Sequence, residues 1–175
     1  MGSPLADARK AYQFKEAFMS KRIDFYTIME KCKDFGKKKI RDIMSRDVIT
    51  VKEDGQFLEF AADIEMYDYL SFPVIDEDNE LVGIISQTDL LKLILFHGST
   101  RNRLLVEKCF MGIPSIRSIM SLHPITLSPD DIVDEAAYLM FEHKIQSIPV
   151  VENKRVVGIV GKIDMIGRIL SMMGL

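Results

Sequence analysis

One segment of the amino-acid sequence is written twice, and this internal repeat constrains the fold more than any other feature. Residues 40–75 recur at 116–151 with a spacing of 76 positions, and residues 82–89 recur at 157–164 with a spacing of 75. The missing residue falls in the polar turn at 76–80, an exposed hairpin in which a length change costs little. The chain therefore contains two copies of one supersecondary unit. The matched residues of the first copy are Ile40-Arg41, Ile43-Met44-Ser45, Ile49-Thr50, Asp54, Glu59, Ala61, Ser71, Pro73-Val74, Val82-Gly83-Ile84 and Asp89.

Each copy predicts the element order β-α-β-β-α. A short β-rich segment, 48–51 or 125–127, precedes an acidic turn and a helix whose apolar residues follow i, i+3, i+4, i+7 spacing. Two apolar strands around a polar turn then predict a hairpin, followed by a second amphipathic helix. The predicted faces of the first helices are Phe57, Phe60, Ala61, Ile64 and Val133, Ala136, Ala137, Met140; those of the last helices are Leu90, Leu91, Ile94 and Met165, Ile169, Met172.

The second copy also carries a helix-start signal, Ser128-Pro129-Asp130-Asp131. Serine suits the N-cap, proline suits the first helical position, and Asp131 stands three residues after Ser128 as in a capping box. This pattern predicts a helix that begins at Pro129.

One unit of this size is too small to bury a good core alone, so the two copies should pack together. We expect an α/β (α+β) fold in which two β-α-β-β-α repeats pack about a pseudo-two-fold axis, with an N-terminal helical extension. The expected organisation is extension 1–36, first repeat 40–95, linker 96–115 and second repeat 116–172. Clefts between related halves commonly hold small molecules, so a binding site is expected at the repeat interface.

The extension has apolar residues near helical spacing and leads into a basic stretch at 31–41. Its helix either packs on its own domain or contacts a partner. The basic stretch reads as a solvated linker, with a local nucleic-acid contact as the alternative. The apolar positions are Ala11, Phe14, Phe18, Phe25, Met29 and Cys32.

Composition argues against several function classes. The net charge of −3 provides no global reason to bind nucleic acid, and the longest apolar run, 93–96, is far below the roughly 20 residues of a membrane span, which predicts a cytoplasmic protein. His97, His123 and His143 share no metal-ligand spacing, and the two cysteines indicate no disulfide framework. No catalytic set and no glycine-rich phosphate loop is recognisable, so neither an enzyme nor a metal site is predicted.

The ordered set of motifs, Met-Ser, Ile-Thr, a helix, Pro-Val, Val-Gly-Ile and a helix-opening Asp, resembles the cystathionine-β-synthase (CBS) repeat family over residues 40–172. The resemblance implies a tandem pair, or Bateman module, that binds an adenosine-containing ligand between repeats and regulates another protein. It also implies that a Gly-x-x-Ser/Thr-x-x-Asp stretch holds the ligand ribose. The first copy matches this stretch completely at 83–89, whereas Gly161 replaces the hydroxyl in the second.

Carried over residue by residue, the resemblance implies two unequal clefts, the stronger marked by Ser86 and Asp89. The other implied first-copy residues are Thr88, Ile49, Thr50, Ser71, Phe72, Pro73 and Val74. The implied second-copy residues are His123, Ile125, Thr126, Ser147, Ile148, Pro149, Lys162 and Asp164.

The Ser86–Asp89 spacing also has a plain physical interpretation. A carboxylate at a helix start accepts two hydrogen bonds from a cis-diol while the helix N–H groups face a phosphate. The same Ser-x-x-Asp spacing is a capping box, in which the pair satisfies backbone donors and binds nothing. Because Asp164 is present although Gly161 cannot complete a box, a ligand role for the aspartates is slightly favoured.

Phosphate binding departs from the family pattern, because no Arg or His precedes either Pro-Val element. Lys162, His123, His143, Lys144, and Arg101 or Arg103 are the candidate substitutes, each with a solvated surface role as the alternative. AMP, ADP, ATP and S-adenosylmethionine all remain candidate ligands.

The leading hypothesis is therefore a regulatory sensor, homodimeric through its CBS helices, that binds an adenosine-containing metabolite and signals to a regulated protein. A second hypothesis is an interaction or structural module without a physiological small ligand. A third is nucleic-acid binding through residues 31–41, which the charge balance disfavours.

Overall fold

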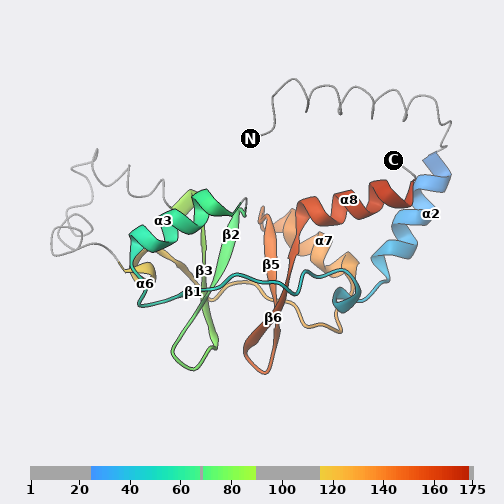
Figure 1. Ribbon diagram of the computed structural model, residues 1–175. Coiled ribbons are helices and arrows are strands. Elements are labelled where there is room, and N and C mark those ends of the chain that lie inside the picture. The colour runs from blue at the N-terminus through green and yellow to red at the C-terminus, as the bar shows by residue number, and fades with distance from the viewer. Residues whose placement is uncertain (1–24, 68, 90–114, 174–175) are drawn as a thin grey trace, which may run out of the picture.

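The computed structural model describes residues 25–67, 69–89 and 115–173 (Figure 1). Several sequence predictions fall outside these residues. They are residues 1–24 of the extension, the helix of Leu90, Leu91 and Ile94, most of the 96–115 linker, and Arg101, Arg103 and His97.

The described chain is a mixed α+β structure built from two related halves, which confirms the predicted fold class. The first repeat contains β1 (Val51–Lys52), α3 (Phe57–Met66), β2 (Ser71–Ile75) and β3 (Leu81–Ser86). The second contains α7 (Val133–Glu142), β5 (Ser147–Glu152), β6 (Arg155–Gly161) and α8 (Lys162–Met172). Before the repeats lie α2 (Phe25–Gly36) and the short helix η1 (Ile40–Asp42); α6 (Ile116–Ile119) and β4 (Ser121–Leu122) precede the second repeat's first extended segment.

The two hairpins repeat the same strand pairing. β1 runs parallel to β2 with Val51 opposite Val74, and Leu127 stands parallel to Val150, 76 positions further on in each case. β2–β3 and β5–β6 are antiparallel. The shorter second hairpin closes at Asn153 and Lys154, both at positive φ, which is the conformation that two-residue hairpin turns require.

Each sheet also receives a segment from the other repeat. We call residues 40–45 and 116–121 the leading segments of the first and second repeat. Ser121 of one leading segment pairs with Ile84 of β3, and Ser45 of the other exchanges two 2.9 Å backbone hydrogen bonds with Ile159 of β6. The halves are thus joined by reciprocal strand pairing.

The two hydrophobic cores show the same exchange. Ile40, Ile43 and Met44 of the first leading segment are buried with Val133 and Ile148 of the second repeat. Ile116, Ile119 and Met120 of the second leading segment are buried with the first repeat's Phe60, Phe72 and Val74. Since neither core is complete without the other half's leading segment, the repeats are expected to fold together.

Two glycines permit this close packing. A Cβ at Gly158 would lie 2.5 Å from Met44 Sδ and 3.0 Å from the Ser45 carbonyl oxygen. A Cβ at Gly83 would lie 2.6 Å from Met120 Sδ and 3.0 Å from the Ser121 carbonyl oxygen. The Val-Gly-Ile and Met-Ser motifs are therefore two sides of one contact, made between repeats.

The prediction that the second copy's first helix begins at Pro129 is wrong. Helix α7 begins at Val133, after an extended Ile132. The Ser128 N–H instead donates to Asp131 Oδ2 at 2.6 Å and closes a turn before the helix. The physical reason is the incoming leading segment, because the Val133 N–H donates to the Lys38 carbonyl and the Ile40 N–H to the Asp131 carbonyl. These bonds hold residues 131–133 extended.

The predicted apolar faces are correct for most of the described positions. Val133, Ala136, Met140 and Met165 are buried, and Phe60 is fully buried. Ala137, predicted on the inner face of α7, is exposed. The buried positions of α7 are 133, 136 and 140, and Ala137 falls beyond the edge of that stripe.

The described part of the N-terminal extension packs on its own domain. Phe35 of α2 is buried in the core of the second repeat, and Lys31 Nζ donates to the Met172 carbonyl at the end of α8 at 2.5 Å. A lysine at a helix C-terminus satisfies a carbonyl that has no helical partner. Phe25, Tyr26 and Met29 of α2 remain exposed.

The basic stretch is largely engaged within the molecule. Lys39 donates to the Asp130 carbonyl, Arg41 forms an ion pair with the Asp130 carboxylate, and Lys37 lies 3.6 Å from Asp34. Together with Lys31, Lys39 and Arg41 attach the first leading segment and α2 to the second repeat, whereas the Lys37 pair lies within the N-terminal segment.

Candidate functional site

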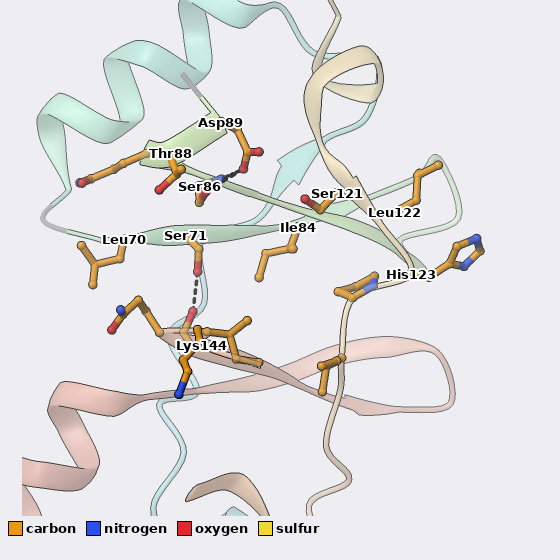
Figure 2. A pocket seen from close by; sticks show the side chains of 16 residues that line it. Leu70, Ser71, Ile84, Ser86, Thr88, Asp89, Ser121, Leu122, His123 and Lys144 are labelled. Carbon is orange, nitrogen blue, oxygen red and sulfur yellow. Dashed lines mark hydrogen bonds between the residues drawn. The ribbon is translucent and has the colours of Figure 1, made fainter. Parts of the chain in front are cut away.

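The two repeats meet at a seam marked by Ser71 and Ser147. These serines occupy equivalent positions at the starts of β2 and β5, and their side-chain oxygens share a hydrogen bond (Figure 2). A contact between equivalent residues of two related units lies on the two-fold axis that relates them. The serine pair therefore marks the pseudo-two-fold axis.

A cavity of about 720 Å³ opens beside this pair, between the repeats. Its size falls in the range of small-molecule pockets. The first repeat contributes Leu70, Ser71, Ile84, Ser86, Gln87, Thr88 and Asp89. The second contributes residues 121–125, on and after β4, and residues 144–147, which lead into β5.

Asp89 is the polar centre of the cavity wall. It is only 5% exposed, and its Oδ2 accepts hydrogen bonds of 2.7 Å from both the Ser86 N–H and the Ser86 hydroxyl (Figure 2). The sequence folds this way because β3 ends at Ser86 and the chain turns directly into a helical segment, which leaves that N–H without a backbone partner. The capping contact considered from the sequence is thus made, with the aspartate as the acceptor from Ser86.

The equivalent place in the second repeat differs. Gly161 is the N-cap of α8 and offers no side-chain hydrogen bond. A Cβ at Gly161 would lie 2.7 Å from Asp164 Oδ2, so the Asp164 carboxylate folds back over the glycine where a hydroxyl is missing. Asp164 is exposed, whereas Asp89 is buried. The two motifs therefore present carboxylates in unlike environments.

The candidate site residues fall into three groups. Seven line the cavity: Ser71, Ser86, Thr88, Asp89, His123, Ile125 and Ser147. Phe72, Pro73, Val74, Ile148 and Pro149 are buried side chains of β2 and β5 that do not line it. Ile49, Thr50, Lys162 and Asp164 occupy the positions equivalent to Ile125, Thr126, Gln87 and Asp89, and they and Thr126 do not line this cavity.

Of the cations considered for phosphate binding, Lys144 and His123 line the cavity, while Lys162 and His143 do not. Ser121, Leu122, Pro124 and Gln146 line it without having been predicted. Ser121 belongs to the repeated Met-Ser motif. Only the exchange of leading segments explains why that motif of one repeat reaches the aspartate motif of the other.

Metal ligands and membrane-spanning helices also bear on function. Within residues 25–67, 69–89 and 115–173, no group of three or more His, Cys, Asp or Glu side chains is placed to hold a metal ion. No helix in the part of the chain that the structure describes has the length and apolar character to cross a membrane.

The chain is similar in sequence to several known proteins. The chain is 28% identical to uncharacterized protein MJ1426 of Methanocaldococcus jannaschii, a match that covers 73% of this chain and 88% of the relative. It is 31% identical to the L-aspartate semialdehyde sulfurtransferase of the same organism over 71% of this chain, but spans only 22% of that enzyme. The similarity to the enzyme is therefore confined to a minor part of its length.

Solved structures share the fold. The structure of CBSX2 in complex with AMP has a TM-score of 0.67 at 22% identity and covers 77% of this chain and 98% of its own. The CBS domain pair of MJ0100, in complex with 5′-methylthioadenosine and S-adenosyl-L-methionine, has a TM-score of 0.63 at 30% identity, with coverage of 78% and 98%. The CBS domain family model matches residues 40–96 and again 116–171. The chain thus belongs to the CBS domain family and carries two CBS domains in tandem.

Proposed function

We propose that the chain is a regulatory module that binds an adenosine-containing metabolite in the cavity between its CBS domains and signals to a partner protein. The main support for this proposal is the cavity itself, because residues of both repeats line it and Asp89 lies in its wall. A ligand held there contacts both halves of the molecule at once.

The lining fits a nucleoside. Ile84, Ile125 and Ile145 supply apolar surface for a base, and the hydroxyls of Ser71, Ser121 and Ser147 supply hydrogen-bond partners. A carboxylate has acceptor sites for about four hydrogen bonds, and Asp89, which accepts two from Ser86, is the carboxylate of this wall that ribose hydroxyls would contact. The ligands named for CBSX2 and MJ0100, which are AMP, 5′-methylthioadenosine and S-adenosylmethionine, support the adenosine class.

Regulation follows if the two halves can shift along the seam. A ligand moves a conformational equilibrium only by the difference between its affinities for the two shapes. Because the cavity is lined by residues on both sides of the Ser71–Ser147 contact, a change in the angle between repeats changes the ligand's contacts. A partner that recognises one shape would then sense the metabolite.

A module without a ligand is the competing function, and the closed contact between Asp89 and Ser86 favours it. In that case the aspartate would only cap the helix. Nucleic-acid binding through residues 31–41 is disfavoured because several of those cations are already engaged with the second repeat.

We also propose a homodimer through the helices of the repeats. Tyr138 and Phe141 on α7 are 63% and 69% exposed, and Ile163 on α8 is 69% exposed. Large apolar side chains exposed on these two helices would be covered in such a contact.

A thermal-shift panel tests the ligand proposal. The purified chain is heated with AMP, ADP, ATP, S-adenosylmethionine or NAD at saturating concentration. A ligand at about 100 times its Kd stabilises the folded state by about 2.7 kcal/mol, or several degrees for a chain of this size.

The variant for this panel is Asp89→Ala, with Asp164→Ala as the matched control, and each shift is measured against the variant's own unliganded Tm. Loss of the ligand-induced shift in Asp89→Ala alone supports the proposal. If no adenosine compound shifts the wild-type Tm, the function without a ligand replaces it.

A further inference from the structure

We infer that the cavity selects nucleosides whose 5′ arm carries no phosphate. This inference rests on the proposed function, since it names the class of ligand within the adenosine compounds. It comes from the charges in the cavity and from the hydrogen bonds that its backbone already makes.

Few ionisable groups line the cavity. Among its described lining residues these are Asp89, Lys144 and His123, and all the others are neutral. The single acidic group is nearly buried and stands beside the proposed ribose position. A phosphate bound close to this carboxylate would be repelled unless a cation were directed at it.

Neither cation is directed into the cavity. Lys144 Nζ lies 4.3 Å from the centre of the Phe141 ring, and Figure 2 shows its side chain extending away from Ser86 and Asp89. The exposed His123 ring also turns outward in that view. Both residues have positive φ, 56° for Lys144 and 53° for His123, so a left-handed backbone conformation sets the direction of each side chain.

Two of the backbone donors at the helix start are also engaged. Free N–H groups at such a start would bind a phosphate. Here the Ser86 N–H donates to Asp89 Oδ2 at 2.7 Å, and the Gln87 N–H donates to the Leu70 carbonyl at 3.2 Å. The two donors nearest the proposed ribose are thus satisfied within the protein.

Among the described lining residues, a phosphorylated ligand would therefore meet no directed cation (Figure 2) to offset its repulsion by Asp89, which disfavours its binding. A neutral thioether arm or a positively charged sulfonium arm carries no such cost, and a positive charge is attracted by Asp89. The expected order of affinity is nucleoside or sulfonium nucleoside first, monophosphate second and triphosphate last.

Calorimetric titration tests this order with adenosine, 5′-methylthioadenosine, S-adenosylmethionine, AMP and ATP at fixed ionic strength. We expect ATP to bind at least about tenfold more weakly than 5′-methylthioadenosine, the factor that corresponds to losing one charge-assisted contact. AMP or ATP binding as tightly as the nucleosides would overturn the inference and leave the proposed function standing. Absence of binding by every compound would overturn both.

A gain-of-affinity variant provides the second test. Gln146 lines the cavity and is exposed, so Gln146→Arg introduces a cation without disturbing the core. This variant should raise the ratio of AMP affinity to 5′-methylthioadenosine affinity about tenfold over the wild-type ratio. Gln146→Glu is the matched control and should weaken AMP binding. An unchanged ratio in Gln146→Arg would contradict the inference, because the lack of a cation would not limit phosphate binding.

Discussion

Ser71 and Ser147, at equivalent positions in the two CBS domains, share a hydrogen bond between their side-chain oxygens at the pseudo-two-fold axis. Both serines also line the cavity in which we propose that the ligand binds. The contact that joins the repeats is therefore part of the proposed ligand site, and ligand binding and repeat geometry share the same two hydroxyls.

The serine pair should contribute modestly to stability. Ser71→Ala and Ser147→Ala are each expected to lower the free energy of unfolding by about 1 kcal/mol, the usual net value of one hydrogen bond. Both changes remove the same bond. The free energy of unfolding of the double variant should therefore lie within a few tenths of a kcal/mol of that of either single variant. Urea unfolding measures this, and fully additive losses would show that the hydroxyls act independently.

Gly158 should tolerate no side chain. A Cβ there would meet Met44 Sδ at 2.5 Å and a backbone oxygen at 3.0 Å, so Gly158→Ala should destabilise the chain by about 1–3 kcal/mol, as overpacking does. The matched control is Gly167→Ala in α8, where a Cβ meets nothing within 4 Å. That variant should gain up to about 1 kcal/mol, because alanine favours a helix. Equal effects of the two substitutions in thermal unfolding would refute the interlocked packing.

Gly161→Ser should restore to the second repeat the contact that the first one has. The new hydroxyl would lie beside the Asp164 carboxylate, whose flexible end can move to accept its hydrogen bond. We expect the free energy of unfolding to rise by about 0.5–1 kcal/mol relative to Gly161→Ala, which adds the Cβ without the hydroxyl. A serine variant no more stable than the alanine one would mean that Asp164 makes no such bond.

If the chain is a dimer through α7 and α8, charged residues placed in the interface should lower the mass of the particle in solution. Replacing Phe141 and Ile163 by Asp together puts charges on exposed apolar helix positions and should convert a dimer into a monomer. Lys38→Asp, at an exposed position before the first leading segment, is the charge control and should remain dimeric. Sedimentation velocity at tens of micromolar chain distinguishes the two masses. A monomeric wild-type chain would contradict the proposed dimer.

The internal repeat was enough to predict the order of the described elements, the two-fold relation and the difference between Ser86 and Gly161. It did not predict which half each leading segment joins. Both copies contain the same Met-Ser and Val-Gly-Ile motifs, so the sequence alone does not show which glycine Met44 packs against. That choice depends on how the two sheets approach each other.

The same exchange explains the wrong helix start. The bonds from residues 38 and 40 to the chain at 131–133 keep Ile132 extended and delay α7 to Val133. Ser128 and Asp131 do form the capping-type hydrogen bond, but it closes a turn and does not start a helix. The backbone groups that the helix would have used are bonded to the first leading segment and Lys38.

Titration calorimetry on a matched pair of variants tests the central claim most directly. Asp89→Asn and Asp164→Asn each remove one charge and keep the side-chain shape, so the Ser86 cap retains an oxygen acceptor. With the best-binding adenosine compound of the panel, we predict about one ligand per chain in the wild type. We also predict an affinity loss of about tenfold or more in Asp89→Asn, and an unchanged affinity in Asp164→Asn. Unchanged binding in Asp89→Asn, or an equal loss in both variants, would contradict the assignment of the ligand site to the Ser86–Asp89 cavity.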